Sequence, residues 1–354
     1  MHSCKVAKNQ AGQRLDKFLH KLLPAAGSGF LYKMLRKKNI TLNGKRAQGN
    51  EVLVLNDEVT LFFSDETFAK FSGQLPASGQ TSETEPTLQK GRVSSQVREY
   101  ENAFAGLQGI TILYEDDDYL IVNKPCGILT QKAVSTDVSL NEWLTGYLLQ
   151  KNPAFGEELS AFHPSVCNRL DRNTSGIVLC GKSLPGLQYL SSIIRERRIR
   201  KFYRTICVGA LKKAVTMQGY LVKKSAENRV TVSRTPPSAA SGEKASPIHT
   251  VCSPILVTDA FTLLEVELVT GKSHQIRAHL AEIGHPLAGD YKYGKVAVNR
   301  LLKEKYGLEH HLLHACRVTF PENLSEPGNF LSGKNICAPC PALFTELEDK
   351  LFGR

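Results

Sequence analysis

The spacing of apolar residues near the start of the chain predicts two helices. Segments 13–23 and 29–38 carry apolar side chains three or four positions apart, with basic residues between them. This is the pattern of an amphipathic helix with one buried face and one solvated face. The apolar faces consist of Leu15, Phe18, Leu19 and Leu22, then Leu31, Met34 and Leu35.

Small strands are predicted directly after these helices. Asn43-Gly44 is a favoured hairpin turn within the segment 40–47. Segment 51–63 alternates apolar and polar residues on both sides of Asn56-Asp57, which predicts paired strands. Two helices followed by short strands indicate a compact unit over residues 1–65. This unit carries eleven Lys or Arg against five Asp or Glu.

The pattern changes twice along the rest of the chain. Segment 66–108 is rich in Ser, Gly, Gln, Thr and Pro and poor in apolar residues, so we expect a flexible linker. Segment 110–125 then predicts a β-hairpin with an acidic turn, and 139–149 and 186–201 predict helices. The Pro- and Ser-containing segment 224–248 is expected to form a long mobile loop.

Composition describes a globular protein with a polyanionic partner. The 354 residues include 42% hydrophobic and 22% charged residues and carry a formal net charge of +11. Such an excess of positive charge favours binding to a polyanion. No apolar run is long enough to cross a membrane, and the first residues lack a secretory core. Nine scattered cysteines fit reduced thiols, so we expect a cytoplasmic protein.

Segment 163–183 contains the strongest candidate for chemistry. Asp171 lies between Arg169 and Arg172 and is followed by turn-forming residues and an apolar run. We expect the two guanidinium groups to hold this carboxylate in an ionised, oriented state, as a carboxylate nucleophile requires. The alternative is a surface turn on which Arg-Asp pairs have no chemical role.

The same segment also fits the phosphate-loop pattern G-x-x-x-x-G-K-[ST]. A phosphate loop wraps its backbone N–H groups around phosphate and opens a helix. Here the four inner positions, 177–180, are apolar and strand-forming, and Pro185 follows closely. The sequence therefore disfavours a nucleotide site, and we expect no nucleotide cofactor.

Residues 168–183 resemble the active-site motif of the RluA/RluC/RluD-type pseudouridine synthases, whose pattern is H-R-L-D-x-x-T-S-G. Further matches follow in the family's order at 114–129, 200–206, 270–294 and 313–315. Two positions depart from the family pattern: Asn168 replaces a His and Lys272 replaces an Arg.

This resemblance implies three catalytic residues. Asp171 matches the family's nucleophile, Arg277 matches the arginine that holds it, and Tyr203 matches the tyrosine that stacks on the base and is placed to help remove the C5 proton. Attack on C1′, attack on C6 and assisted elimination of the base all remain open. The reaction is an isomerisation, so no metal or cofactor is expected.

Further residues are expected to contact the RNA around this centre. Those assigned to the substrate are Arg169, Leu170, Arg172, Lys201 and Leu313. Segment 195–204 holds six Lys or Arg in ten positions, next to an aromatic residue that can stack on a flipped base. The predicted phosphate contacts within it are Arg195, Arg197, Arg198 and Arg200. A solvated helix end would show the same charge run.

The N-terminal unit resembles the S4 RNA-binding domain over about residues 12–63. Its predicted phosphate contacts are Arg14, Lys33, Arg36, Lys37, Lys38, Lys45 and Arg46. The expected fold class is α+β. It comprises an S4-like domain over 1–65, a flexible linker over 66–108 and a catalytic domain over 109–354. The resemblance implies that the catalytic domain has a mixed, mostly antiparallel sheet with flanking helices.

The sequence thus predicts a monomeric, cytoplasmic RNA pseudouridine synthase, with ribosomal RNA of the large subunit as its expected substrate. Alternatives are a synthase acting on transfer RNA, a catalytically silent RNA-binding or ribosome-assembly factor and, more remotely, a phosphate-loop NTPase. Cys337 and Cys340 form a lone C-x-x-C, which does not supply the four ligands of a closed zinc site.

Overall fold

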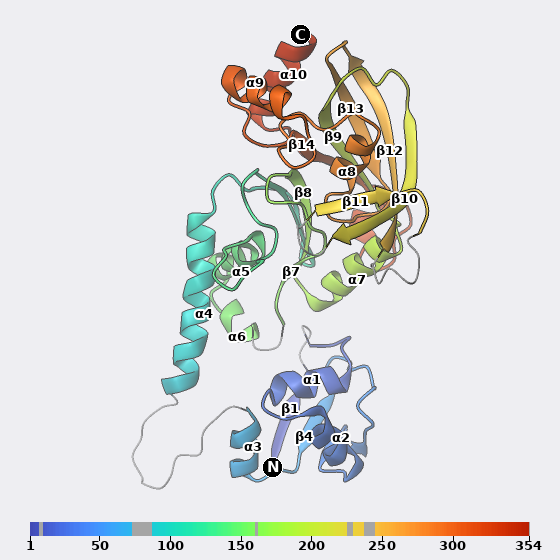
Figure 1. Ribbon diagram of the computed structural model, residues 1–354. Coiled ribbons are helices and arrows are strands. Elements are labelled where there is room, and N and C mark those ends of the chain that lie inside the picture. Colours follow the sequence, from blue (N-terminus) through green and yellow to red (C-terminus); the bar gives the residue numbers. More distant parts are fainter. Residues whose placement is uncertain (7–9, 73–86, 160–161, 225–228, 237–244, 354) are drawn as a thin grey trace. The chain divides into compact units, whose positions relative to one another are not determined.

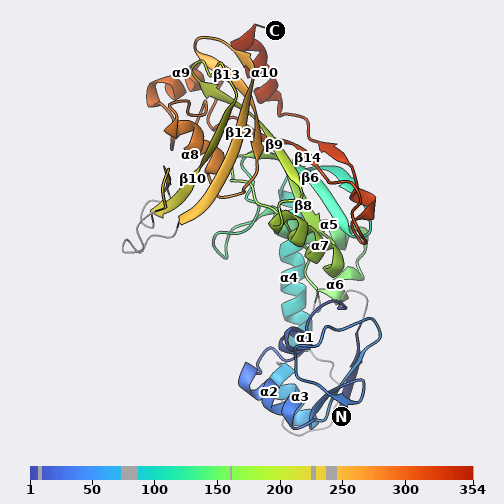
Figure 2. The same cartoon turned by 90° about the vertical axis from the view of Figure 1, so that its right-hand side faces the viewer.

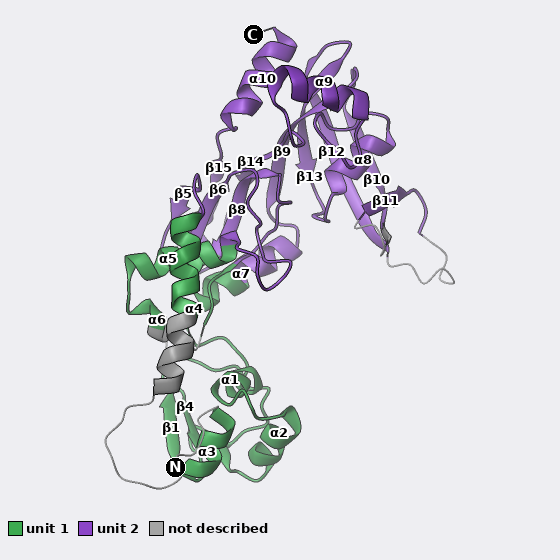
Figure 3. Ribbon diagram, turned by 60° about the vertical axis from the view of Figure 1, so that its left-hand side comes forward, with its two compact units in different colours: residues 1–106, 141–165, 181–188 green, residues 107–140, 166–180, 189–354 purple. Residues whose placement is uncertain are grey.

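The structure, a computed structural model, describes residues 1–6, 10–72, 87–159, 162–224, 229–236 and 245–353. It divides into two compact units, coloured green and purple in Figure 3. The first contains residues 1–106, 141–165 and 181–188. The second contains residues 107–140, 166–180 and 189–354.

The N-terminal part of the first unit forms the two predicted helices and a small sheet. Helices α1 (Leu15–Leu22) and α2 (Ser28–Arg36) bury the expected leucines. The sheet has the order β1-β4-β2-β3, with bounds β1 His2–Lys5, β2 Ile40–Leu42, β3 Lys45–Arg46 and β4 Glu58–Leu61. The predicted hairpin turn is confirmed, because Leu42 pairs with Lys45 and both Asn43 and Gly44 have positive φ.

The prediction of paired strands over 51–63 was wrong in its first half. Only β4 is a strand, and Val52 forms a single bridge to Arg14. The reason is that β4 pairs with β1 and β2 instead. The Asp57 carboxylate accepts the Val54 N–H and the Asn43 side-chain amide, both at 2.8 Å, and so ties the turn to the hairpin.

The expected linker contains two helices. Helices α3 (Asp65–Ser72) and α4 (Thr87–Gly106) occupy most of its described residues, and the rest of the prediction, over 73–86, lies outside them. The end of α4 lies beside α5 (Leu140–Lys151), which is followed by α6 (Phe155–Glu158) (Figure 3). Phe104 packs on Trp143, with ring centroids 5.7 Å apart, and Gly146 lets the two helices approach at Tyr100. These few aromatic contacts are too sparse to stand out in a polar sequence.

The second unit is built on an eleven-stranded sheet (Figures 1 and 2). Its main order is β11-β10-β12-β13-β9-β14-β8-β6-β5, with β15 beside β14 and β7 beside β8. The bounds are β5 Thr111–Glu115, β6 Tyr119–Lys124, β7 Ser165–Val166, β8 Ser175–Gly181, β9 Arg200–Val208, β10 Val215–Lys224, β11 Arg229–Ser233, β12 Ala245–Val257, β13 Phe261–Leu268, β14 Leu313–Thr319 and β15 Asn335–Cys337. Strands from β11 to β14 are antiparallel to their neighbours, whereas β14 and β8 are parallel. The sheet is thus mixed and mostly antiparallel, as predicted.

The parallel pairing of β8 with β14 depends on a glycine. Gly176 has a φ of +112°, and a Cβ there would lie 2.3 Å from the carbonyl oxygen of Ala315. Only glycine fits this close approach without a backbone shift. The pairing joins the strand that follows Asp171 to the strand that begins at Leu313.

Helices of the second unit flank this sheet. They are α7 (Leu184–Arg195, which begins in the first unit), α8 (Gln275–Glu282), α9 (Val296–Tyr306) and α10 (Ala342–Phe352). Helix α8 contacts β11 and β12 (Figure 1), and α9 and α10 pack over buried residues of β9 and β13.

Two expectations about this half of the chain need correction. The helix predicted over 186–201 ends at Arg195, because the chain turns through a positive φ at Arg197 and starts β9 at Arg200. The loop predicted over 224–248 contains β11 and the start of β12, while its residues 225–228 and 237–244 lie outside the described residues.

Candidate active site

The loop that carries Asp171 is fixed by hydrogen bonds on both sides. Thr130 Oγ1 donates to the Leu170 carbonyl at 2.9 Å and accepts the Leu170 N–H at 3.1 Å. The Thr174 N–H donates to the Asp171 carbonyl at 3.0 Å and closes a tight turn. Asp171 therefore lies on a defined turn directly before the buried strand β8.

A buried lysine holds the other side of this turn. Lys124 is fully buried, and its ammonium donates to the carbonyls of Pro125, Ile128 and Arg172 at 2.9, 2.9 and 3.2 Å. Burial lowers its pKa to about 8. Three carbonyl acceptors satisfy its three donors, so Lys124 links the end of β6 to the Asp171 turn.

Asn168, which departs from the family pattern, bridges to β8. Its Nδ2 donates to the Ile177 carbonyl at 3.2 Å, and its Oδ1 accepts the Leu179 N–H at 2.7 Å. An amide can donate and accept at the same time. The asparagine therefore anchors the segment that leads into Arg169.

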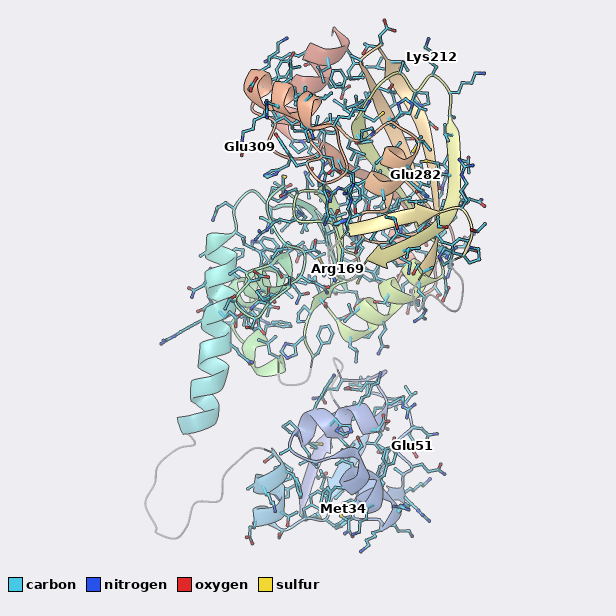
Figure 4. All side chains as sticks on the ribbon, in the orientation of Figure 1. Met34, Glu51, Arg169, Lys212, Glu282 and Glu309 are labelled. Atoms are coloured by element: carbon cyan, nitrogen blue, oxygen red, sulfur yellow. The ribbon has the colours of Figure 1, made fainter. Side chains whose placement is uncertain are left out.

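Arg277 on α8 contacts the Asp171 carboxylate, with 3.1 Å between Arg277 Nη1 and Asp171 Oδ2. The expected pairing of Asp171 with Arg169 and Arg172 does not appear, since both side chains are exposed and no ion pair among the described residues joins them to Asp171. Figure 4 labels Arg169. These two side chains reach solvent from the turn, whereas Arg277 approaches the carboxylate from α8.

Asp290 holds Arg277 in place. Its two carboxylate oxygens accept Arg277 Nε at 2.7 Å and Nη2 at 3.0 Å, a bidentate pair. Asp290 Oδ1 also accepts the backbone N–H groups of Lys292 and Tyr293. Burial would raise the pKa of this acid, but the Arg277 hydrogen bonds and charge outweigh burial and lower the pKa.

His274 completes the surroundings of Asp171. Its Nε2 lies 3.8 Å from Asp171 Oδ2, and its backbone has a φ of +58°. Its Nδ1 lies 3.0 Å from the Tyr293 hydroxyl, which accepts the Val230 N–H at 3.0 Å. Burial lowers the pKa of His274, against the opposite effect of Asp171. If the Tyr293 hydroxyl donates to Nδ1, a neutral ring carries an Nε2–H on the side of Asp171.

Tyr203 lies on β9, opposite Ala315 of β14, and is buried. Burial, together with the negative charge of Asp171, raises the pKa of its phenol. A protonated phenol can stack and donate but is a poor base. A buried, protonated phenol suits the expected stacking role, and the expected role in removing the C5 proton stays a prediction.

Asp171, Arg277, His274 and Tyr203 line one cavity of about 760 Å³. It brings together the three predicted catalytic residues, all five predicted substrate contacts, and Arg195 and Arg197. Arg198 does not line it, and Arg200 is exposed and forms a bidentate ion pair with Glu267. Burial lowers the pKa of Lys201, which lines the cavity.

The predicted RNA contacts of the N-terminal unit are exposed. Arg14 makes a bidentate pair with Asp16, at 2.8 Å for Nη2. Among the described residues no acidic partner faces the other six: Lys33, Arg36, Lys37, Lys38, Lys45 and Arg46. They lie at the end of α2 and in and just before the β2–β3 hairpin.

The structure also bears on two other kinds of site, a phosphate loop and a metal site. The phosphate-loop pattern lies in and directly after strand β8, so its inner residues are paired in a sheet and do not form a loop. Within the described part of the chain, no three His, Cys, Asp or Glu side chains are grouped to hold a metal ion. No helix among the described residues is long and apolar enough to span a membrane.

Comparison with known proteins agrees with this geometry. A family model described as RNA pseudouridylate synthase matches residues 118–282, which include Asp171, Tyr203 and Arg277. The chain is 28% identical over 324 residues to a ribosomal large subunit pseudouridine synthase C from Vibrio cholerae, covering 91% of this chain and 89% of the relative. Residues 118–282 of this chain form an RNA pseudouridylate synthase domain.

A second relative and a solved structure point the same way. The synthase of the same name from Escherichia coli is 29% identical over 320 residues, or 89% of this chain and 87% of that protein. Among solved structures, human RNA pseudouridylate synthase domain containing 4 superposes with a TM-score of 0.54 and 21% identity, over 73% of this chain and 97% of the human one. At this identity the human structure supports the fold of the synthase.

Sequence reasoning missed several residues of this synthase site. Asp290 and His274 fall inside a matched segment, but no spacing rule links either of them to Asp171. Thr130 and Lys124 act through backbone carbonyls. The signal in the sequence for Lys124 was a lysine at the end of a mostly apolar run, directly before Pro125.

Proposed function

We propose that this protein isomerises uridine to pseudouridine in the ribosomal RNA of the large subunit, with Asp171 as the nucleophile. One observation carries the proposal. The Asp171 carboxylate lies 3.1 Å from a buried, bidentate-anchored Arg277, at the wall of a cavity large enough for a nucleotide. Two relatives that are named ribosomal large subunit pseudouridine synthases support the choice of RNA.

The two oxygens of Asp171 have different surroundings. Arg277 and His274 both approach Oδ2, at 3.1 and 3.8 Å. Among the described residues no hydrogen bond reaches Oδ1. We assign Oδ1 as the attacking atom, because its lone pairs face no donor, while Oδ2 is fixed by the cation.

The reaction breaks the N1–C1′ bond of the uridine, turns the uracil and forms a C5–C1′ bond. The C5 proton leaves to solvent, so nothing is oxidised. Attack on C1′, attack on C6 and assisted elimination of the base all satisfy this balance. In each, the contact with Arg277 keeps the carboxylate aimed. No cofactor enters any step.

The remaining cavity residues hold the extracted nucleotide. Tyr203 and Leu313 lie on the adjacent strands β9 and β14 and would pack against the uracil. Arg169, Arg172, Lys201, Arg195 and Arg197 supply positive charge for the flanking phosphates, and Leu170 closes the wall. Extracting a base from its stack costs a few kcal/mol, which phosphate contacts can offset.

The N-terminal residues 1–65 would act as an S4-like RNA-binding domain and residues 109–354 as the catalytic domain. The segment between them, 66–108, would act as the connection, with α4 as a rigid part of it. Exposed basic residues on α2 and the β2–β3 hairpin support the RNA-binding role. We propose that the protein works as a cytoplasmic monomer.

The test is release of tritium from ribosomal RNA of the large subunit labelled at uracil C5, without ATP or added metal. The proposed function predicts release from this RNA and little release from transfer RNA. Release from transfer RNA alone would show that the substrate is transfer RNA and not ribosomal RNA. Binding to both without release would identify a catalytically silent RNA-binding factor.

A further inference from the structure

A second cleft of about 480 Å³ opens on the other side of the nucleophile. It shares Asp171, Arg172, His274 and Arg277 with the active-site cavity. The remaining lining residues come from the turn after Asp171, the 289–292 turn and the 309–311 loop. These are Asn173, Gly289, Tyr291, Lys292, Glu309, His310 and His311.

The walls of this cleft are fixed. Gly289 has a φ of +76°, and a Cβ there would lie 2.3 Å from the His310 carbonyl, so only glycine lets the two loops meet. Asn299 accepts the Gly289 N–H at 3.0 Å and donates to the Asp290 carbonyl at 2.8 Å. Because these backbone contacts hold both loops in place, the cleft is a fixed part of the fold.

Tyr291 presents an aromatic ring in this cleft. It is 53% exposed, although its hydroxyl donates to the Asn299 carbonyl at 3.4 Å. An exposed ring with a tethered hydroxyl is a stacking platform of the kind that single-stranded RNA uses.

The charges around Tyr291 suit a phosphate backbone. Arg172 is exposed and Lys292 is half-buried on the same cleft. His310 accepts the Asn173 side-chain amide at Nδ1, at 3.0 Å, which leaves its Nε2–H as a donor. The acid on this cleft besides Asp171, Glu309 (labelled in Figure 4), forms an ion pair with Lys303 at 3.0 Å.

We propose that this second cleft binds the nucleotide that flanks the target uridine, with its base stacked on Tyr291 and its phosphate near Arg172 and Lys292. The inference rests on the proposed function, because it takes RNA as the substrate. A flipped uridine stays bonded to both neighbours, so the RNA chain must continue out of the active-site cavity, and the second cleft adjoins that cavity through shared lining residues.

The test compares Tyr291→Ala with Tyr291→Trp in the full-length protein. Stacking contributes equally to the ground and transition states, so its loss raises KM and spares kcat. For one stacked base, Tyr291→Ala should raise KM by roughly 5- to 150-fold, while Tyr291→Trp stays near wild type. KM and kcat come from tritium release on ribosomal RNA of the large subunit, and filter binding gives Kd for the same RNA.

The matched control is Phe330→Ala, which removes an exposed aromatic ring that lines neither cleft. KM and Kd of Tyr291→Ala within about twofold of wild type, or an equal rise in Phe330→Ala, would overturn the inference and leave the proposed function intact. An inactive wild type whose Kd is still weakened by Tyr291→Ala would refute the synthase function and keep Tyr291 as an RNA contact.

Discussion

At the scale of single residues, Arg277 connects two acids with different tasks. Asp290 is fully buried at its side chain and holds the guanidinium by two hydrogen bonds, whereas Asp171 is partly exposed and accepts one. The buried acid fixes the cation, and the cation then fixes the acid that faces the cavity. The proposed catalysis would depend on this order, because an error of about 1 Å in a reacting group can cost roughly 100-fold in rate.

Asp290→Asn should therefore lower kcat by roughly 100-fold while leaving Kd for RNA unchanged, since Asp290 does not line either cleft. Single-turnover tritium release and filter binding would measure the two quantities.

The folded pKa of Asp290 is below its unfolded value of 3.8, so its stabilising contribution is present above pH 3.8 and lost as pH falls further. Wild type should lose that stability in acid, and Asp290→Asn should not. A kcat of Asp290→Asn equal to that of wild type would contradict the positioning role of Asp290.

Two buried histidines should make the folded state less stable at a less acidic pH, between 6.5 and 4. Burial lowers the pKa values of His279 and His311 from 6.5 to about 4. Because the folded values lie below the unfolded value, the stability they contribute is present above pH 6.5 and lost as pH falls toward 4. The loss is on the order of 3 kcal/mol for each histidine. Urea unfolding across this range would measure the slope, and His279→Asn should make it shallower. An identical slope in that variant would contradict the assignment.

At the scale of elements, the pairing of β8 with β14 sets the distance between Asp171 and Leu313. Gly176→Ala should break this pairing, because the added Cβ would lie 2.3 Å from the Ala315 carbonyl at a φ of +112°. We expect a loss of stability of about 1–3 kcal/mol or more and a loss of activity. Thermal unfolding and tritium release would measure these effects. Gly29→Ala in α2 is the control, since nothing lies within 4 Å of its new Cβ. A Gly176→Ala protein as stable as that control would contradict the argument.

The elements that the sequence predicted well are those with a local cause. Helix α1 follows from its leucine spacing, and the β2–β3 hairpin follows from Asn43-Gly44. Helix α4 was missed because its order comes from contacts such as that of Phe104 with Trp143, about forty residues away. Residues 51–55 were misassigned because the partners of β4 are distant strands, which alternation cannot reveal.

The candidate site shows the same contrast between local and long-range causes. The resemblance placed Asp171, Arg277 and Tyr203 at one cavity, and the structure puts all three there. Local reasoning expected Arg169 and Arg172 to hold the acid, because they are its neighbours in sequence. The structure supplies Arg277, 106 residues away, and backs it with Asp290. Hydrogen bonds across such separations leave no periodic trace in a sequence.

At the scale of the whole molecule, the net charge of +11 predicts salt-dependent RNA binding. Replacing Lys37 and Lys38 by Gln should weaken binding and reduce the slope of log K against log salt by roughly 0.7 for each phosphate that the protein no longer neutralises. Filter binding of the full-length protein at several salt concentrations would measure this slope. The matched control replaces Lys212 and Lys213, an exposed pair outside both clefts (Figure 4 labels Lys212). Equal slopes for the two variants would remove the N-terminal unit from the RNA interface.

The central claim is that the Asp171 carboxylate performs the chemistry, and Asp171→Asn tests it directly because this change keeps shape and removes charge. The measurement is the rate of tritium release from C5-labelled ribosomal RNA of the large subunit, with RNA binding measured in parallel. We predict a fall on the order of 10⁴- to 10⁶-fold with binding retained. Release at a rate near that of wild type would contradict the account.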